Sequence, residues 1–484
     1  MTRKKKIGYA KVLLCSILIM ISFANIQVDA QSGIGVRVNG VAVVFKDTKA
    51  FINNNNYALA PVRELCEALG ARVKWNGALK QITITNEEKT IILTINQKTA
   101  LVDGKEISLK TQAVLKNNKT LVPIKFITDT LNHKAEWKQK SQMIDITAQP
   151  LYNHYRGQLH SHTGVSDGYG EVEEAYKWAK EKGNVDFFAV TDHSNLFDNG
   201  DEATFESHNS EEWALMKKTA DEYNEDGEFI AIAGYELTYW DKVSGHMNTY
   251  NTEGFYSRRS IELEPYYEKL EKEVDSFSQF NHPGTTWGDF QDFGFYSKER
   301  DDVIHLFEVG NGPGKQLNSD YWRCDGYYFK ALDKGWHVAP TNGQDNHNRD
   351  WVTTNPFRTV ILAKDLTREA LFDAIREHRV YAAEDKNVEV NYTLNGYVMG
   401  SEITDSVNQL NIYIGVKDPD VADKVQDITI YTNGGKIVDY KTFNSNNINY
   451  QVSLAPKAEQ SYYYVRIRQK DNNYIITAPI WIDK

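Results

Sequence analysis

Two short motifs in this chain each place metal-binding side chains two residues apart: His160-Ser-His162 and Asp345-Asn-His347. Side chains two residues apart in a strand point to the same face, so each pair would direct both of its ligands at one point. Each pair follows an apolar run, which places it at the end of a strand, where barrel enzymes form their active sites. The two pairs therefore predict a metal site at the strand ends of one domain.

Five further histidine or carboxylate residues lie between these pairs, most of them at the end of an expected strand. They are Asp167 in Ser-Asp-Gly, His193 in Thr-Asp-His, Glu236 in Gly-Tyr-Glu, His246 in Gly-His-Met and His282 in Asn-His-Pro. Mixed imidazole and carboxylate ligands favour zinc, iron, manganese or nickel over calcium, which prefers oxygen alone. The absence of cysteine from these motifs argues against a closed structural zinc site. We therefore expect a catalytic centre with two or three divalent transition metal ions, for which zinc, manganese and iron are the candidates.

The motifs lie in a central segment, residues 152–387, in which apolar runs alternate with helical runs. Strands are expected at 185–191, 229–233, 277–281, 303–310 and 337–342, and helices at 172–182 and 211–223. This alternation predicts parallel strands joined by helical crossovers. The length is compatible with a barrel, although the apolar runs alone do not separate a barrel from an open sheet.

An internal repeat occupies residues 33–148. The sequence Ala-Leu-Ala-Pro-Val-Arg around Pro61 returns as Thr-Leu-Val-Pro-Ile-Lys around Pro123, 62 residues later, and the same interval separates Trp75 from Trp137. In each copy a proline precedes an expected helix, and a strand pair follows, at 72–75 and 81–85 in the first copy. The repeat predicts a small, duplicated α+β domain.

Alternating strands replace the helical pattern in the last segment, residues 388–484. They are expected at 410–416, 427–432, 450–454 and 462–469, with turn residues between them. This pattern predicts an antiparallel β-sandwich. Its task could be to cover the central domain or to bind a polymer.

The first thirty residues have the layout of a secretory signal peptide. Basic residues precede an apolar run at 12–23, which is shorter than the ~20 residues that a membrane-spanning helix needs, and Val28-Asp-Ala30 follows. We therefore expect residues 1–30 to be removed, giving a secreted or envelope-associated protein without a transmembrane helix. Only Cys66 and Cys324 would remain, too few for a disulfide framework.

The composition is that of a globular, acidic protein with several domains. The chain has 484 residues, 41% of them hydrophobic, and a formal net charge of −11. Loss of residues 1–30, which carry five positive charges and one negative charge, would change this charge to about −15. Because such a surface repels polyanions, we expect no extended nucleic-acid-binding surface.

In their order along the chain, the motifs resemble those of the PHP superfamily, named for polymerase and histidinol phosphatase, and most of all its exported CehA/McbA-type metallohydrolases. The shared order is His-x-His, Ser-Asp-Gly, Thr-Asp-His, a glutamate, a histidine, Asn-His-Pro and Asp-x-His. The resemblance implies a distorted seven-stranded (βα) barrel with up to three metal ions. It assigns His160, His162 and Asp345 to one ion, His246 and His282 to a second with Glu236 bridging both, and Asp167, His193 and His347 to a third. Many members have histidine in place of Asp167, and aspartate resembles the usual variant of this branch, but it could weaken the third site or change its metal.

The duplicated segment resembles the N-terminal domain of copper amine oxidases, which recurs as a stalk on exported bacterial proteins. Apart from His133, the segment offers little that binds copper. The resemblance therefore implies a spacer or a domain that associates with the cell wall, and no copper site.

The expected activity is hydrolysis by a hydroxide that bridges two metal ions, because a close pair of ions lowers the pKa of water. Glu236, His282 and Asp345 would be the catalytic residues. Arg349 would contact an anionic substrate group, with Arg323 and Arg358 as weaker candidates. The leading substrates are small-molecule or short oligomeric phosphoesters, either monoesters or diesters, with nucleotides and oligonucleotides among them. Hydrolysis of a carbamate, ester or amide is the alternative for this site, and a catalytically silent envelope-binding protein is the alternative of another class.

Overall fold

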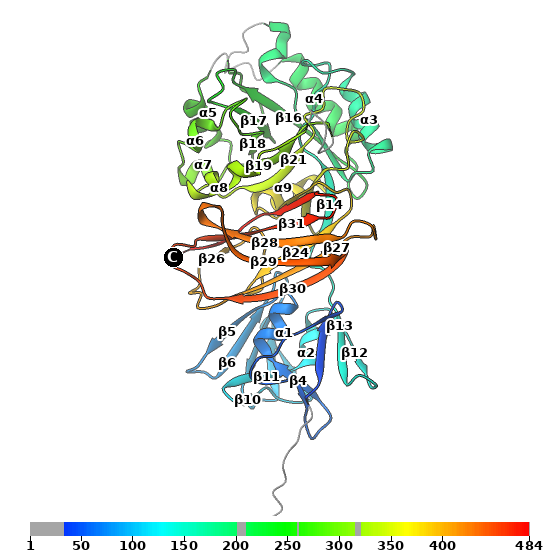
Figure 1. Cartoon of the computed structure of the whole chain (residues 1–484), viewed down its shortest axis with the longest axis vertical. Coiled ribbons are helices and arrows are strands. Elements are labelled where there is room, and N and C mark those ends of the chain that lie inside the picture. Colours follow the sequence, from blue (N-terminus) through cyan, green and yellow to red (C-terminus); the bar gives the residue numbers. More distant parts are fainter. Residues whose placement is uncertain (1–32, 201–209, 259–260, 315–320, 484) are drawn as a thin grey trace, which may run out of the picture.

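The structure, a computed structural model, describes residues 33–200, 210–258, 261–314 and 321–483. Three bodies follow one another along its long axis (Figure 1). The N-terminal domain (blue to cyan) forms one end, the central domain (green to yellow) forms the other, and the C-terminal sheets (orange to red) lie between them. The expected signal peptide, residues 1–30, lies outside the described residues. Within the described residues, no helix has the length and apolar character needed to cross a membrane.

Two copies of one structural unit make up most of the N-terminal domain. The first copy contains β4 (Ala58–Pro61), α1 (Val62–Ala68), β5 (Arg72–Asn76) and β6 (Gln81–Thr85), and the second contains β11 (Lys119–Pro123), α2 (Ile124–Thr130), β12 (Lys134–Lys138) and β13 (Met143–Thr147). The two helices and the two strand pairs each begin 62 residues apart, which is the interval of the sequence repeat. The copies meet where β4 pairs antiparallel with β11, with Ala60 opposite Val122.

The other strands of this domain complete its small sheets. They are β1 (Gly35–Val38), β2 (Val41–Ala42), β3 (Phe51–Ile52), β7 (Thr90–Thr94), β8 (Thr99–Val102), β9 (Lys105–Ser108) and β10 (Val114–Lys116). Their buried aliphatic side chains form a hydrophobic core separate from those of the other domains. Cys66 is part of this core, and it and Cys324 are both free and buried, which confirms that they form no disulfide.

The central domain is built on a large, curled, mixed sheet. Its elements up to the middle of the domain are β14 (Asn153–Gln158), α3 (Val172–Lys182), β15 (Phe187–Val190), η1 (Ser194–Gly200), α4 (Glu211–Tyr223), β16 (Ile230–Thr238), β17 (His246–Tyr250), α5 (Leu263–Leu270) and β18 (Phe277–Asn281). They are followed by α6 (Phe290–Phe293), α7 (Lys298–Asp301), β19 (Ile304–Asn311), β20 (Trp322–Arg323), α8 (Asp325–Asp333), β21 (Ala339–Gly343), β22 (Arg358–Ala363), α9 (Arg368–Arg376) and β23 (Val380–Ala383). In this sheet the strand order is β20-β19-β18-β17-β16-β15-β14-β22-β23, and β21 pairs with β19.

The helices of this domain follow from local sequence signals. α3 begins at a capping box in which Glu171 and Glu174 each accept a backbone N–H of the first turn,. Its apolar residues recur at helical spacing, so that Val172, Ala175 and Ala179 are buried against the sheet,. The expected bounds of α3 and of α4 are confirmed.

The expectation that the central strands are parallel is only partly correct. β14, β15 and β16 are parallel neighbours, as are β18, β19 and β21. β17, however, runs antiparallel to both β16 and β18, and β22 runs antiparallel to β14. The connection from Thr238 to His246 is too short for a helical crossover, so β16 and β17 form a hairpin,.

The segments that follow β14 and β21 approach each other beside the metal-ligand motifs. An isolated parallel bridge joins Ser161, which follows β14, to Asn346, which follows β21. The backbone N–H of His162 donates to the Asn346 carbonyl at 3.0 Å, and that of Asp345 donates to the His160 carbonyl at 3.1 Å. The two motifs that are most distant in the sequence are therefore adjacent in space.

The C-terminal part is antiparallel, and its strands fall into two groups. They are β24 (Glu389–Leu394), β25 (Tyr397–Val398), β26 (Glu402–Ile403), β27 (Leu410–Lys417), β28 (Val425–Thr432), β29 (Lys436–Ser445), β30 (Asn447–Leu454), β31 (Tyr462–Gln469), β32 (Tyr474–Thr477) and β33 (Ile480–Ile482), with η2 (Asn433–Gly435) between β28 and β29. β24, β25, β27 and β30 form a sheet of their own, whereas β32, β31, β28 and β29 continue the central sheet from β23.

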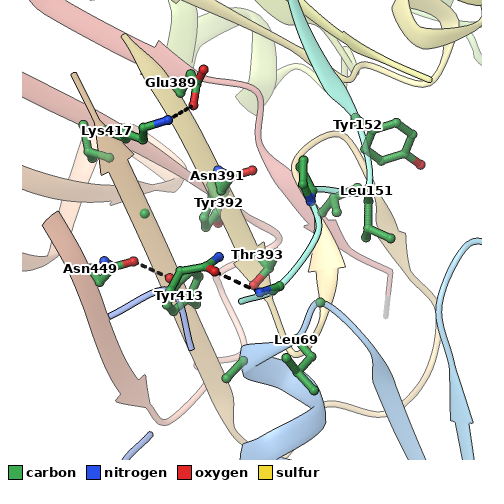
Figure 2. Close-up of a pocket in the computed structure, with 18 of the residues that line it drawn as sticks. Leu69, Leu151, Tyr152, Glu389, Asn391, Tyr392, Thr393, Tyr413, Lys417 and Asn449 are labelled. Carbon is green, nitrogen blue, oxygen red and sulfur yellow. Dashed lines mark hydrogen bonds and ion pairs between the residues drawn. The ribbon is translucent and has the colours of Figure 1, made fainter. Parts of the chain in front are cut away.

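A cavity of about 440 Å³ separates the N-terminal domain from the C-terminal sheet of β24, β27 and β30 (Figure 2). Leu69, at the end of α1, faces Tyr413 of β27 across it, and the linker residues Leu151 and Tyr152 line one side. None of the candidate metal ligands lines this cavity.

Candidate metal centre

All nine candidate ligands come together at one end of the curled sheet. His160 and His162 follow β14, His193 follows β15, Glu236 lies in β16, His246 begins β17, His282 follows β18, and Asp345 and His347 follow β21. Asp167 lies in the loop between β14 and α3. Placement at strand ends, which the spacing of the two motifs predicted, is confirmed for most of them.

Glu236 is the carboxylate at the middle of this centre. It is 1% exposed. Its Oε1 lies 3.4 Å from His160 Nε2, 3.3 Å from His246 Nδ1 and 3.5 Å from His282 Nε2. Its Oε2 lies 2.6 Å from His193 Nδ1. Burial alone would raise the pKa of Glu236, but the surrounding histidines outweigh burial and hold that pKa well below its usual value,.

Asp345, which is half-buried, is the second carboxylate that faces several histidines. Its Oδ1 lies 3.0 Å from His162 Nε2 and 3.4 Å from His160 Nε2, and its Oδ2 lies 3.9 Å from His282 Nε2. The backbone of Asp345 has φ +47° and that of His282 has φ +29°, a left-handed conformation that is unfavourable for residues other than glycine,. Such strain persists where the surrounding structure enforces it, and it is common at functional sites.

A third group of ligands lies at the open side of the centre. Asp167 Oδ1 is 3.1 Å from His347 Nε2 and 3.5 Å from His193 Nε2. Burial would lower the pKa of His347, but Asp167 and Asp345 raise it to about 9. Burial would raise the pKa of Asp167, but His347 and His193 lower it to about 2. The two side chains thus form an ion pair at neutral pH.

The ligand atoms form groups compact enough to hold metal ions. Within each of the following groups the atoms lie within 4.8 Å of one another: His160, His162 and Glu236; Glu236, His246 and His282; and His162, Asp167, His193 and His347. The first two groups share Glu236, and the first and third share His162. The donors are imidazole nitrogens and carboxylate oxygens, a set that fits first-row transition metal ions.

Glu308 in β19 is a residue of this centre that the sequence motifs do not include. It is fully buried. Its Oε1 lies 2.8 Å from His160 Nδ1, and its Oε2 accepts the backbone N–H of His282 at 2.8 Å. A carboxylate that holds one imidazole nitrogen directs the other nitrogen at the metal, so Glu308 positions His160. The sequence offered one signal for this residue, which is a glutamate inside an apolar strand. A glutamate is almost never buried without a partner, so its position there indicates one.

Asp192, the middle residue of Thr-Asp-His, accepts hydrogen bonds from the loop that follows His162. Its Oδ1 accepts the backbone N–H of Thr163 at 2.7 Å, and its Oδ2 accepts the Thr163 hydroxyl at 2.7 Å. It also accepts the hydroxyl of Ser166, the neighbour of Asp167, at 2.5 Å. Asp192 therefore fixes the turn that carries Asp167.

The three candidate substrate-binding arginines have different surroundings. Arg349 is exposed at the rim, and its nearest carboxylate is Glu174 at 3.7 Å. Arg323 is paired with the buried Glu384 at 2.5 Å, and the buried Arg358 donates to the backbone carbonyls of Asn355 and Phe357. Arg323 and Arg358 thus stabilise the fold, and Arg349 alone of the three has its guanidinium at the open side.

An aromatic side chain lines another part of the centre. The ring of Trp287, which is partly exposed, lies 5.3 Å from the ring of His246 and 6.0 Å from that of His282. It adds an apolar wall beside the second ligand group.

Comparison with known proteins gives a family match for the N-terminal domain and remote relatives for the chain. Residues 37–146 match the copper amine oxidase N-terminal domain. Uncharacterized proteins of Chlamydia pneumoniae and Chlamydia muridarum are 21% and 23% identical over 71% and 78% of this chain. The match covers 59% and 62% of those relatives, so the chain spans about three fifths of their length.

The comparison with solved structures includes a remote match. It is a two-domain protein of Bacteroides vulgatus described as containing a predicted PHP-like metal-dependent phosphoesterase. The alignment covers 66% of this chain and 90% of that one, with 16% sequence identity and a TM-score of 0.38.

Proposed function

We propose that this protein is a metal-dependent hydrolase that cleaves phosphomonoesters or phosphodiesters. The observation that carries the proposal is the position of Glu236, whose two oxygens are shared among histidines from four different strand ends. A carboxylate shared between two ligand groups suits a two-metal hydrolytic site, because it can hold two ions close together. The order of the motifs, which resembles that of the PHP superfamily, supports the same conclusion.

The nine ligands would form three metal-binding groups. His160, His162 and Asp345 would hold one ion, His246 and His282 a second, and Glu236 would contact both. Asp167, His193 and His347 would hold a third. When bound, such ions supply a hydroxide nucleophile near neutral pH and stabilise the negative charge of the transition state.

The open side of the centre favours an anionic substrate. Asp167 and His347 are the most exposed of the nine ligands, so substrate would enter beside them. Arg349 lies two residues beyond His347 and would contact a phosphoryl oxygen. A third ligand group at this entrance favours phosphoryl transfer over attack on an acyl carbon, because a phosphoryl group presents more charged oxygens.

The curled sheet is then best understood as the distorted seven-stranded (βα) barrel of the PHP superfamily, followed by a β-sandwich. The bridge between Ser161 and Asn346 supports closure, because it joins the segment that follows β21 to the segment that follows β14. The shared apolar core of the two C-terminal sheets supports the sandwich.

We further propose export and a stalk role for the N-terminal domain. The signal-peptide pattern supports export. The domain lies at the opposite end of the molecule from the metal centre, which suits a spacer that holds the centre away from the cell wall (Figure 1). Sedimentation of the mature protein with purified cell walls tests this role.

A substrate panel with the purified mature protein tests the proposed activity. It would contain aryl phosphates, phosphodiesters, nucleotides and aryl carbamates, each with manganese or zinc. We expect the wild type to hydrolyse phosphoesters. We expect Glu236→Ala to lose both this activity and the bound metal. Turnover of carbamates alone would refute the phosphoesterase proposal, and a protein without bound transition metal would favour a silent binding protein.

A further inference from the structure

A second cluster of carboxylates lies where the central sheet passes into the C-terminal part. Asp385 follows β23, and Asp418 and Asp423 lie in the loop between β27 and β28. One oxygen from each of the three lies within 4.8 Å of the others. Asp385 and Asp418 are buried, and Asp423 is half-buried.

These carboxylates have no close ion-pair partner among the described residues. In the described parts of the chain, no ion pair involves Asp385, Asp418 or Asp423, and the neighbouring Lys386 pairs instead with Asp420 at 3.1 Å. Burial, together with the nearby Asp385 and Asp423, raises the pKa of Asp418 to about 7. Three carboxylates at this separation repel one another unless a cation lies between them.

A buried amide points at the same place. Gln469 in β31 is 1% exposed, and its Nε2 donates to Asp385 Oδ2 at 3.0 Å and to Asp418 Oδ2 at 2.9 Å. Its Oε1 is buried and has no hydrogen-bond partner. Leaving a buried acceptor unpaired is unfavourable. Rotation of the amide by half a turn would place Oε1 beside the carboxylate oxygens. This arrangement is favourable only if a cation lies between the oxygens.

We propose that Asp385, Asp418, Asp423 and the amide oxygen of Gln469 form a structural calcium site. All four donors are oxygens, which Ca²⁺ prefers and which distinguish this cluster from the histidine centre. Backbone carbonyls and water would complete the six to eight ligands that Ca²⁺ takes. The ion would tie the end of β23 to the 418–423 loop and to β31, and thereby fix the C-terminal sheets on the central domain.

Calcium-dependent melting of the whole mature protein tests this site. The histidine centre is first saturated with Zn²⁺, which favours imidazole ligands over an all-oxygen site, so that Ca²⁺ bound there does not contribute. For an affinity of about 10⁻⁴ M, as in extracellular calcium modules, 5 mM Ca²⁺ should raise Tm by about 5 °C. Mg²⁺ at the same concentration should give a smaller shift, because it requires a stricter octahedral geometry.

Three variants determine where the calcium acts. The shift should disappear in Asp418→Asn and in Asp423→Asn, and remain in the control Asp405→Asn, whose carboxylate is exposed on the same C-terminal part. Without calcium, Asp418→Asn should melt no lower than the wild type, because it removes a like charge. If Asp418→Asn fails to fold, Asp423→Asn, at a half-buried position, decides. A wild type without a calcium shift, or a full shift in either variant, would overturn the proposal.

Discussion

At the scale of single residues, the centre is an arrangement of carboxylates that would repel one another without the histidines between them. Glu236 is buried and Asp345 is half-buried, and the histidines hold the pKa of each well below its usual value. The ligand positions therefore depend on side chains that hold the histidines in place, and Glu308 is the clearest of these.

Replacing Glu308 by glutamine should reduce metal binding without unfolding the protein. The amide can still occupy the site, but it holds Nδ1 of His160 less firmly, and losses of such partners commonly cost 10- to 100-fold in metal affinity or activity. Elemental analysis and kcat/KM at limiting metal would measure the change. Glu67→Gln serves as the control, because Glu67 is a buried glutamate in the N-terminal domain. Equal metal affinity in Glu308→Gln and in the wild type would contradict the positioning role.

The ion pair of Asp167 and His347 predicts a pH dependence of the metal-free protein. The pKa of His347 is raised to about 9 from an unfolded value near 6.5,. A raised histidine pKa stabilises the fold fully below the unfolded value, and this contribution is lost as pH rises from about 6.5 to 9. Asp167→Asn should lower the pKa of His347. The free energy of unfolding of this variant should therefore fall less than that of the wild type across this pH window.

Urea unfolding in EDTA at pH 6 and pH 9 measures this difference. The other histidines are present in both proteins, so the comparison isolates the contribution of Asp167. If the free energy of unfolding changes equally with pH in the two proteins, the ion pair of Asp167 and His347 does not form in solution.

At the scale of elements, the metal centre depends on how closely β19 and β21 pack. Gly343, the last residue of β21, lies against Glu308, and a Cβ at this position would overlap Glu308 Oε1 and crowd His160. Gly343→Ala should therefore displace Glu308 and lower the metal content by at least as much as Glu308→Gln. Gly326→Ala is the matched control, because a Cβ there meets no atom within 4 Å and alanine favours the helix α8,. Full metal content in Gly343→Ala would show that β21 can shift without cost to the centre.

Much of this element structure could be predicted from the sequence. The pattern of apolar residues predicted the bounds of α3, α4, β18 and β31 as the structure has them, because helical spacing marks the two helices and short apolar runs mark the two strands. The direction of β17 could not be predicted, since an apolar run records burial and not orientation. Glu308 was missed for a related reason: its role depends on β19 lying beside the ends of β14 and β18, which no local pattern in the sequence records.

At the scale of the whole molecule, the central and C-terminal parts share a sheet and a core. β23 pairs with β32, so that Tyr381 lies opposite Thr477, on the far side of the boundary expected near Asn387. One apolar cluster includes Val360 of the central sheet together with Ile412 and Val465 of the C-terminal sheets. The N-terminal domain, by contrast, has a core of its own.

This difference predicts how fragments of the chain behave. Residues 152–387 alone would leave β23 without β32 and expose the apolar cluster, and an uncovered strand edge promotes aggregation. This fragment should therefore aggregate or melt far below the intact protein, whereas residues 152–483 should fold and bind metal. Residues 33–148 should melt cooperatively alone, because their core is complete. Circular dichroism melts and metal content of the three fragments provide the measurement. A soluble 152–387 fragment with full metal content would show that the continuous sheet joins two independent folding units.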